Sequence, residues 1–85
     1  MKLLRSKKFV KQYVKLPETT RKKVDRCLRL LAADSRHPGI RARKMVNQEN
    51  IWEARADLHT RITFQVEDDQ IKLRAVGTHE IYRRP

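Results

Sequence analysis

Alternation of apolar and polar side chains between residues 52 and 75 limits most strongly what this chain can fold into. The run 61–67 places every second side chain on one apolar side, at Ile62, Phe64 and Val66. Two flanking runs repeat the pattern at Trp52, Ala54, Ala56, Ile71, Leu73 and Ala75. This period of two is typical of β-strands that bury one face. Three strands that share one apolar face are therefore predicted.

The connections between these runs are short and contain turn-forming residues, at 57–60 and 68–69. Short turns of this kind join neighbouring strands as an antiparallel meander. Such a sheet buries one face and leaves the other open to solvent. The open face is expected to carry Glu53, Arg55, Arg61, Lys72 and Arg74.

Two amphipathic helices are predicted before the strands. Ser6 is a candidate N-cap, and apolar residues at helical spacing follow it as far as Pro17. A second helix is expected from about Glu18 to Ala33, with an inner face formed by Val24, Cys27, Leu28 and Leu31. Residues 2–5 fit either a short strand or an extended lead-in, and 41–46 fit an edge strand between a break at 34–40 and a turn at 47–50.

These elements define one α+β domain over residues 1–85, with two N-terminal helices packed on one face of a small antiparallel β-sheet in the order β-α-α-β-β-β. A chain of 85 residues buries only roughly 60% of its unfolded surface, so a shallow groove is expected rather than a deep cavity. The net charge is +11, and residues 1–45 hold 15 Lys and Arg against 3 Asp and Glu. This excess favours a polyanion or an acidic protein as partner.

Several kinds of chemistry lack support in the sequence. The histidines lie about twenty positions apart, and the single Cys27 is expected to be a buried thiol, so neither metal-ligand spacing nor a cysteine nucleophile is indicated. No glycine-rich phosphate loop is present. No apolar run reaches membrane length and no secretory signal is visible, so we expect a cytoplasmic protein with no cofactor, no metal and no membrane association.

The side chains that remain on the open face suit phosphoryl transfer on RNA, which brings its own nucleophile in the 2′-hydroxyl. The protein must then supply a base, cations for the phosphate charge and an acid for the leaving 5′-oxygen. His79 can act as the acid near neutral pH, and Arg61 can hold the phosphate. Without further support, His79 also fits an exposed tail histidine, the arginines a solvated strand face, and Trp52 a core residue.

The chain resembles the RelE/ParE superfamily of toxins from bacterial type II toxin–antitoxin systems, and within it the RelE-like mRNA interferases. The resemblance is carried in order by the two helices, His37-Pro38, Arg41-Ala42-Arg43-Lys44-Met45, Ile51-Trp52-Glu53-Ala54-Arg55, Arg61-Ile62-Thr63-Phe64, Val76-Gly77-Thr78-His79 and Tyr82. It implies an endoribonuclease that cleaves mRNA in the ribosomal A site through 2′-hydroxyl attack, and so inhibits translation. It also implies a cognate antitoxin that blocks the site.

The same resemblance suggests roles for individual residues. Arg61 corresponds to a phosphate-contacting catalytic residue, His79 to the acid, and Tyr82 to an aromatic that stacks on or orients the base. Related enzymes place a Glu or a Lys as general base in the segment before the tryptophan strand, where this chain offers only Arg41, Arg43 and Lys44. Glu53, one strand further on, is therefore the candidate base, and it equally fits an ion pair with Arg55, Arg61 or Arg74. The candidate RNA-binding residues are Arg41, Arg43, Lys44, Arg55 and Arg74.

Two alternatives remain open from the sequence. One is a ParE-like toxin of the same fold that inhibits DNA gyrase and catalyses nothing. The other is an RNA-binding homologue with weak or no catalytic activity, for which RNA binding would depend steeply on salt without cleavage.

Overall fold

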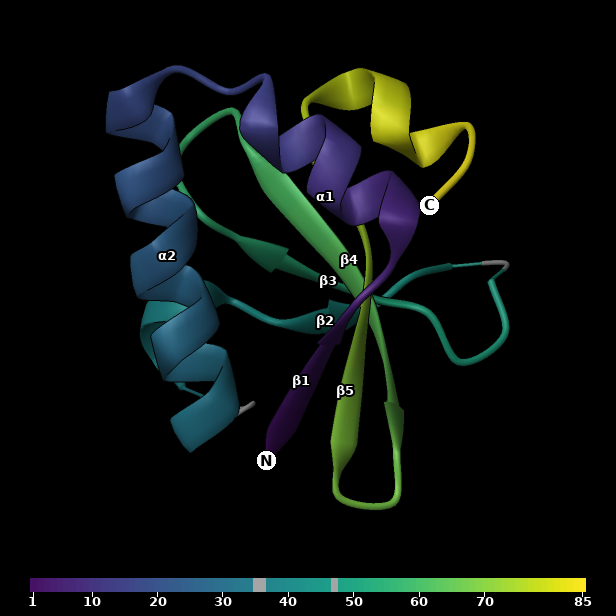
Figure 1. The fold of residues 1–85 in the computed structure, drawn as a ribbon. Helices are drawn as coiled ribbons and strands as arrows, with labels where there is room; N and C mark the ends of the chain where they lie inside the picture. The colour runs from purple at the N-terminus through teal and green to yellow at the C-terminus, as the bar shows by residue number, and fades with distance from the viewer. Residues whose placement is uncertain (35–36, 47) are drawn as a thin grey trace.

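The computed structural model describes residues 1–34, 37–46 and 48–85. Parts of the predicted break, at residues 35–36, and of the predicted turn, at residue 47, lie outside this description. Along the chain, the elements are β1 (Lys2–Arg5), α1 (Lys7–Val14), α2 (Glu18–Ala33), the 3₁₀ turn η1 (Pro38–Ile40), β2 (Arg43–Lys44), β3 (Trp52–Arg55), β4 (Arg61–Glu67), β5 (Gln70–Gly77) and the 3₁₀ turn η2 (His79–Tyr82) (Figure 1).

The strands form one sheet in the order β1-β5-β4-β3-β2. The three predicted strands β3, β4 and β5 pair antiparallel as a meander, and β2 adds a two-residue edge strand to β3. β1 pairs parallel to β5, which settles the open question about residues 2–5. A parallel pair needs a long crossover, and here the connection between β1 and β5 contains both helices and the strands β2, β3 and β4. The predicted α+β fold is confirmed, with a sheet that is mostly antiparallel.

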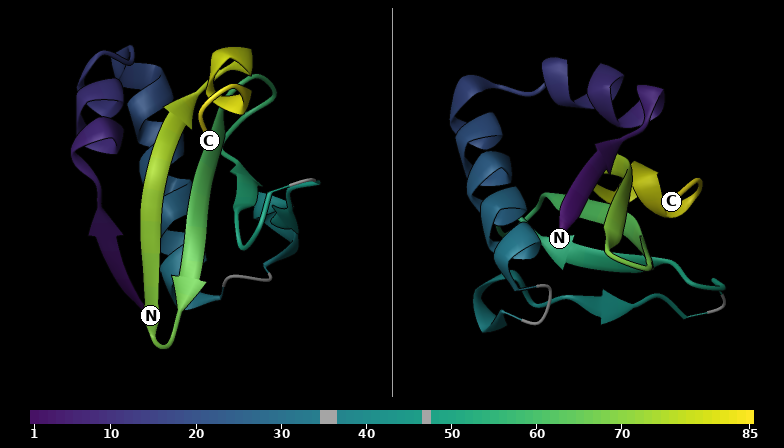
Figure 2. Two further views of the ribbon diagram at one scale, coloured as in Figure 1. Left: turned by 90° about the vertical axis from the view of Figure 1, so that its right-hand side faces the viewer. Right: turned by 60° about the horizontal axis from the view of Figure 1, so that its bottom comes forward.

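The helix limits agree with the sequence signals. The Ser6 hydroxyl accepts the backbone N–H of Phe9 at 3.0 Å, as an N-cap residue does, and α2 begins directly after Pro17. Both helices lie on one side of the sheet in Figure 2. Their inner side chains meet the sheet in one core that includes Phe9, Leu28, Leu31, Ile62 and Phe64. Among the described helices, none is long and apolar enough to cross a membrane.

A bulge in β5 changes which side chains face the helices. The register between β4 and β5 shifts at Thr63/Phe64, so that Phe64 pairs with Leu73 but Thr63 pairs with Ala75. The extra residue, Arg74, reverses the alternation that follows it. As a result Val76 joins the helix-side core and Ala75 shares the outer face with Thr63, so the prediction for Ala75 was wrong.

The outer face of the sheet is also less open than predicted, because the chain folds back onto it after β5. Ile81 in η2 is only 2% exposed, and a Cβ built on Gly77 would lie 2.8 Å from its Cγ2 atom. Beneath this segment, Thr63 and Ala75 are fully buried. The expectation of an uncovered outer face is therefore corrected: the C-terminal segment covers one part of it and leaves a hollow beside it.

Candidate functional site

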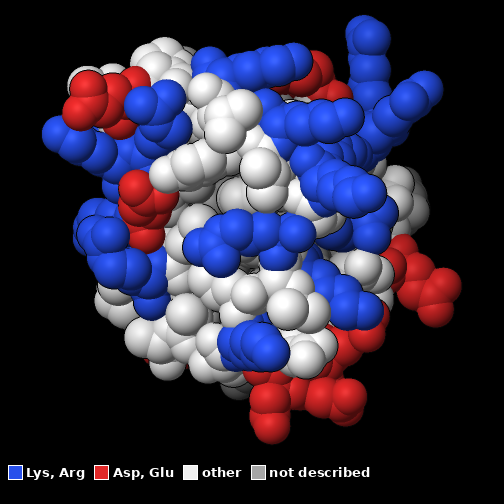
Figure 3. All heavy atoms as spheres, viewed as in Figure 1, with Lys and Arg blue, Asp and Glu red and all other residues white. Residues whose placement is uncertain are grey.

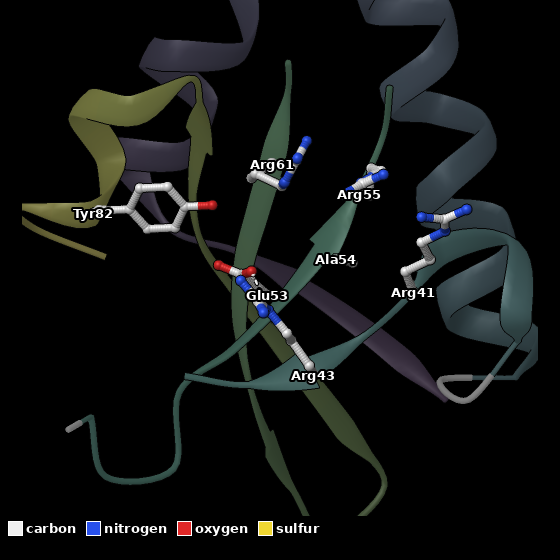
Figure 4. Close-up of a pocket in the computed structure, with 7 residues that line it drawn as sticks. All are labelled: Arg41, Arg43, Glu53, Ala54, Arg55, Arg61 and Tyr82. Atoms are coloured by element: carbon white, nitrogen blue, oxygen red, sulfur yellow. Dashed lines mark hydrogen bonds and ion pairs between the residues drawn. The ribbon is translucent and has the colours of Figure 1, made fainter. Parts of the chain in front are cut away.

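That hollow is a shallow pocket of about 210 Å³ on the outer face of the sheet. Side chains from β2, β3, β4, η2 and the end of η1 converge on it (Figure 4). The lining residues are Arg41, Arg43, Glu53, Ala54, Arg55, Arg61 and Tyr82. The structure thus brings together three of the predicted catalytic residues and three of the predicted RNA-binding residues.

The register of the strands explains why these side chains meet. Arg55 on β3 pairs directly with Arg61 on β4, and one row further along Glu53 pairs with Thr63. Residues two apart on a strand share a face, so all four belong to the outer face. Like charges directly opposite each other destabilise a sheet. An anion placed between Arg55 and Arg61 would relieve that repulsion.

Arg61 is held rigidly by the loop that precedes it. Its Nη1 atom donates to the carbonyl oxygens of Asp57 at 2.9 Å, Leu58 at 3.1 Å and Thr60 at 3.3 Å. A guanidinium carries five N–H donors, so these bonds fix the group while other donors remain for a ligand. An arginine fixed before the ligand arrives loses little side-chain entropy on binding.

The loop itself is fixed by the carboxylate of Asp57. Its Oδ1 atom accepts the backbone N–H groups of His59 at 2.9 Å and Thr60 at 2.7 Å. Burial raises the pKa of Asp57, but these hydrogen bonds together with the charge of Lys23 outweigh it and lower the pKa overall. Asp57 therefore favours its charged form, which keeps the carbonyls around Arg61 in place.

Glu53 is the acidic residue among the lining side chains, and it is paired with Arg43. The Arg43 Nε–H donates to Glu53 Oε1 at 2.6 Å, and this hydrogen bond raises the pKa of Arg43. The predicted partners Arg55, Arg61 and Arg74 were wrong. The cause is the pairing of β2 with β3, which sets Arg43 directly opposite Glu53 and could not be derived from a two-residue strand.

Tyr82 closes the pocket from the C-terminal side. Its hydroxyl points toward Glu53 in Figure 4, and burial followed by the charge of Glu53 raises the pKa of Tyr82. The ring is placed there by η2, which Ile81 anchors on Gly77. A neutral hydroxyl and a flat ring at this position suit contact with a nucleobase.

Three predicted site residues lie outside this pocket. His79 is exposed at the start of η2, with its ring centroid 6.0 Å from that of Tyr82. Arg74 donates to Gln65 Oε1 at 2.8 Å and to the Pro85 carbonyl at 2.9 Å, so it holds the C-terminal segment. Lys44 is exposed and lines a neighbouring hollow that also touches Arg43.

Two features of the site were not predicted from the sequence. Arg41 lines the pocket with a left-handed backbone, at φ 47° and ψ 46°, a conformation that costs a non-glycine residue about 1–2 kcal/mol. Thr63 is fully buried, and its hydroxyl has no hydrogen-bond partner among the residues that the structure describes. The alternation in β4 places Thr63 on the outer face, but its burial depends on the returning C-terminal segment.

Charge is distributed unevenly over the rest of the surface. Lys and Arg side chains spread over the helices and the region of the C-terminal segment in Figure 3, while acidic side chains gather where Figure 1 draws the β4–β5 hairpin. The basic surface agrees with the excess of Lys and Arg counted in residues 1–45. On this face, a polyanion is therefore attracted to the helices and the C-terminal segment and repelled from the hairpin tip.

Comparison with known proteins shows where this fold occurs. Neither protein-family models nor curated proteins gave a match. Among solved structures, a chain of the RelB–RelE antitoxin–toxin complex from Methanococcus jannaschii is 25% identical with a TM-score of 0.78, over 96% of this chain and 99% of that chain. The YoeB dimer from Staphylococcus aureus is 17% identical with a TM-score of 0.78, over 93% and 97%. The intact RelBE complex from E. coli is 19% identical with a TM-score of 0.74, over 91% and 94%.

The shared fold extends over nearly the full length of each chain, and the basic pocket lies within it. Fold and site together define a small α+β protein of the kind found in toxin–antitoxin systems. The fold is that of the RelE/ParE superfamily of toxins. The resemblance noted from the sequence is thereby confirmed at the level of the superfamily.

Proposed function

We propose that this protein is the toxin of a toxin–antitoxin pair and that it cleaves mRNA in the ribosomal A site without a metal ion. The observation that supports this proposal is the pocket in which Arg61 and Tyr82 meet three further arginines and Glu53. Arginine binds phosphate oxygens through two parallel hydrogen bonds, so such a set suits one phosphate and its neighbours. A flat ring beside them suits the adjoining base.

The reaction requires one proton acceptor and one proton donor. In the proposed step Glu53 accepts the proton of the 2′-hydroxyl, and the 2′-oxygen forms a bond to phosphorus while the bond from phosphorus to the 5′-oxygen breaks. His79 donates a proton to the leaving 5′-oxygen. The products are a 2′,3′-cyclic phosphate and a 5′-hydroxyl, with charge on the phosphate stabilised by Arg55 and Arg61.

His79 takes part from the rim of the pocket. Its ring neighbours that of Tyr82 at 6.0 Å between centroids, and its exposed position on η2 leaves it accessible to a long substrate. A leaving oxygen that extends past Tyr82 would meet it there. Catalytic hydrogen bonds often tighten only when the substrate is bound, and His79 is expected to approach the leaving oxygen in that complex.

The proposal is tested in a purified bacterial translation reaction followed by primer extension on the mRNA. Cuts at ribosome-bound codons are expected with the natural protein and not with Arg61→Ala or His79→Ala. Lys72→Ala is the matched control, because Lys72 lies on the same sheet but is paired with Glu67 at 3.0 Å outside the pocket. Intact mRNA and normal translation with the natural protein would reject the proposal.

One observation favours a second candidate function, inhibition of DNA gyrase without catalysis. Glu53, the proposed base, is already engaged by Arg43 at 2.6 Å. A toxin that only binds its target needs no free base. A supercoiling assay with purified gyrase separates the two functions: inhibition of supercoiling together with undamaged mRNA would support this second candidate.

We also propose that a cognate antitoxin binds this chain, since several of its structural neighbours were solved as complexes with RelB or YefM. The net charge of +11 favours an acidic partner. Coexpression with an antitoxin encoded beside this chain is expected to remove toxicity and to raise solubility. Growth that is unaffected by expression of this chain alone would contradict the toxin assignment.

A further inference from the structure

The ion pair between Arg43 and Glu53 is strongly asymmetric. The Glu53 side chain is 6% exposed, whereas the Arg43 side chain is 75% exposed. A buried carboxylate is thus neutralised by a guanidinium that remains largely in water. Arg43 belongs to a two-residue edge strand, and the contact to Glu53 uses its Nε atom. Breaking a buried pair leaves an uncompensated charge, so Arg43 can leave only where other groups stabilise the Glu53 carboxylate.

The surroundings of Glu53 are arranged to receive its charge when Arg43 leaves. Thr63 is its direct neighbour across the β3–β4 ladder, and the Thr63 hydroxyl is buried without a hydrogen-bond partner in the described part of the chain. The hydroxyl of Tyr82 points toward the same carboxylate (Figure 4). A buried hydroxyl without a partner is unusual. A Thr63 hydroxyl that gains a hydrogen-bond partner only when the ligand binds would account for it.

A phosphate group has the chemistry to compete with Glu53 for Arg43. Arg41, Arg55 and Arg61 line the same pocket as Arg43, so an RNA backbone bound there places phosphate oxygens within reach of it. Phosphate and carboxylate bind a guanidinium in the same two-pronged manner, and phosphate carries more acceptor oxygens. The charged groups that face Glu53 are therefore arginines that an RNA phosphate also attracts.

We propose that Arg43 and Glu53 form an exchangeable ion pair, in which an RNA phosphate takes Arg43 and leaves Glu53 charged and unpaired beside the bound ribose. This inference rests on the proposed function, because it describes how that pocket takes up RNA. The free protein holds its base in an inactive pair, and substrate binding releases it. Arg43 acts as a positioning residue for Glu53 and contributes to phosphate binding at the same time.

The exchange is measured as a thermodynamic cycle in RNA binding. The probe is a short 2′-O-methyl RNA, which cannot be cleaved, and its affinity is followed by fluorescence anisotropy. Glu53→Gln frees Arg43 and is expected to tighten binding about five-fold or more, the lower end of ordinary coupling between sites. Arg43→Gln is expected to weaken binding, and to weaken it more when Glu53→Gln is already present, because Arg43 then no longer has to leave a partner.

The matched control is Glu67→Gln, which removes the same charge from an exposed pair with Lys72 outside the pocket. It corrects for the general increase in positive charge. Equal tightening by Glu53→Gln and Glu67→Gln, or additive effects of Arg43→Gln and Glu53→Gln, would overturn the exchange. Arg43→Lys keeps the charge but cannot form two parallel hydrogen bonds to a phosphate. With lysine at position 43, the coupling energy to Glu53→Gln should be less than half of that measured with arginine. Circular dichroism confirms that each variant is folded.

The cycle separates this proposal from the ribonuclease proposal. Tighter RNA binding by Glu53→Gln with no cleavage by the natural protein in translation reactions would support the exchange and reject the ribonuclease. Cleavage by the natural protein, together with additive effects of Arg43→Gln and Glu53→Gln on RNA affinity, would support the ribonuclease and reject the exchange. RNA binding that does not respond to Arg43→Gln in either background would overturn the exchange whatever the catalytic result.

Discussion

Ile81 rests on the bare Cα of Gly77, so closely that a Cβ at position 77 would lie 2.8 Å from the Ile81 Cγ2 atom. This contact turns the chain back over the outer face and brings Tyr82 to the pocket. Gly77 is the last residue of β5 and pairs with Arg61 on β4. The contact between Gly77 and Ile81 therefore holds the end of β5 and positions Tyr82 at the edge of the pocket.

The first prediction concerns this contact. Gly77→Ala should lower the free energy of unfolding by about 1–3 kcal/mol, as overpacking in a filled interior does. Replacing Ile81 by Leu removes the Cγ2 atom, so the double variant should regain part of that loss. Urea unfolding of the two single variants and the double variant measures this. A Gly77→Ala protein as stable as the natural one would show that the segment does not pack here.

A second prediction follows from the lowered pKa of Asp57. A carboxylate whose pKa is lower in the folded state stabilises the fold above its ordinary pKa of 3.8, and that contribution is lost as pH falls through the folded value. Asp57→Asn should therefore be less stable than the natural protein at pH 7, with a smaller difference below pH 3.8. Urea unfolding at both pH values tests this. A difference that is constant with pH would contradict it.

Tyr82 provides a third prediction, which needs no RNA. Burial and the charge of Glu53 raise the pKa of Tyr82, so its phenolate should form at higher pH than in a free tyrosine, and Glu53→Gln should move the transition back toward 10.0. Tyr13 is an internal control, since its pKa is raised by a hydrogen bond to Asp25. Ultraviolet titration, assigned with Tyr82→Phe, measures both. A Glu53→Gln titration identical to that of the natural protein would place Tyr82 away from Glu53.

Arg55 gives a fourth prediction, on the salt dependence of RNA binding. If Arg55 contacts a phosphate, Arg55→Gln should reduce the slope of log affinity against log salt by about 0.7, the value for one contact to a single strand. Lys22→Gln is the control, because Lys22 is exposed on α2 and paired with Glu18 at 3.6 Å. Equal changes in slope for the two variants would mean that RNA binds over the whole basic surface.

Much of the fold could be predicted because its signals are local. Ser6 and Pro17 mark helix starts by their backbone preferences, and the alternation around Phe64 is strong enough to define a strand without knowledge of its neighbours. The bulge at Arg74 could not be predicted, because it adds one residue to a regular pattern. As a result of the bulge, Val76 rather than Ala75 faces the core, and this depends on the pairing with β4.

The sequence could predict most of the residues that form the site, but not which of them contact each other. Arg55 and Arg61 were expected on one face from their spacing, and the structure places them opposite each other. The contact of Arg43 with Glu53 depends on the register of a two-residue strand, for which the sequence carries no periodic signal. Tyr82 was expected near the site by resemblance, while its place over Glu53 depends on the close contact of Ile81 with Gly77.

In the proposed reaction, the 2′-hydroxyl of the mRNA is the nucleophile, and the protein acts on it from the arginine pocket. The most direct measurement uses a translated mRNA that carries one 2′-deoxynucleotide at the position cleaved in the all-ribose message. Cleavage at that position is expected to disappear, while cuts at other codons persist and end in 2′,3′-cyclic phosphates. Continued cleavage at the deoxy position, or no cleavage of either message, would contradict it.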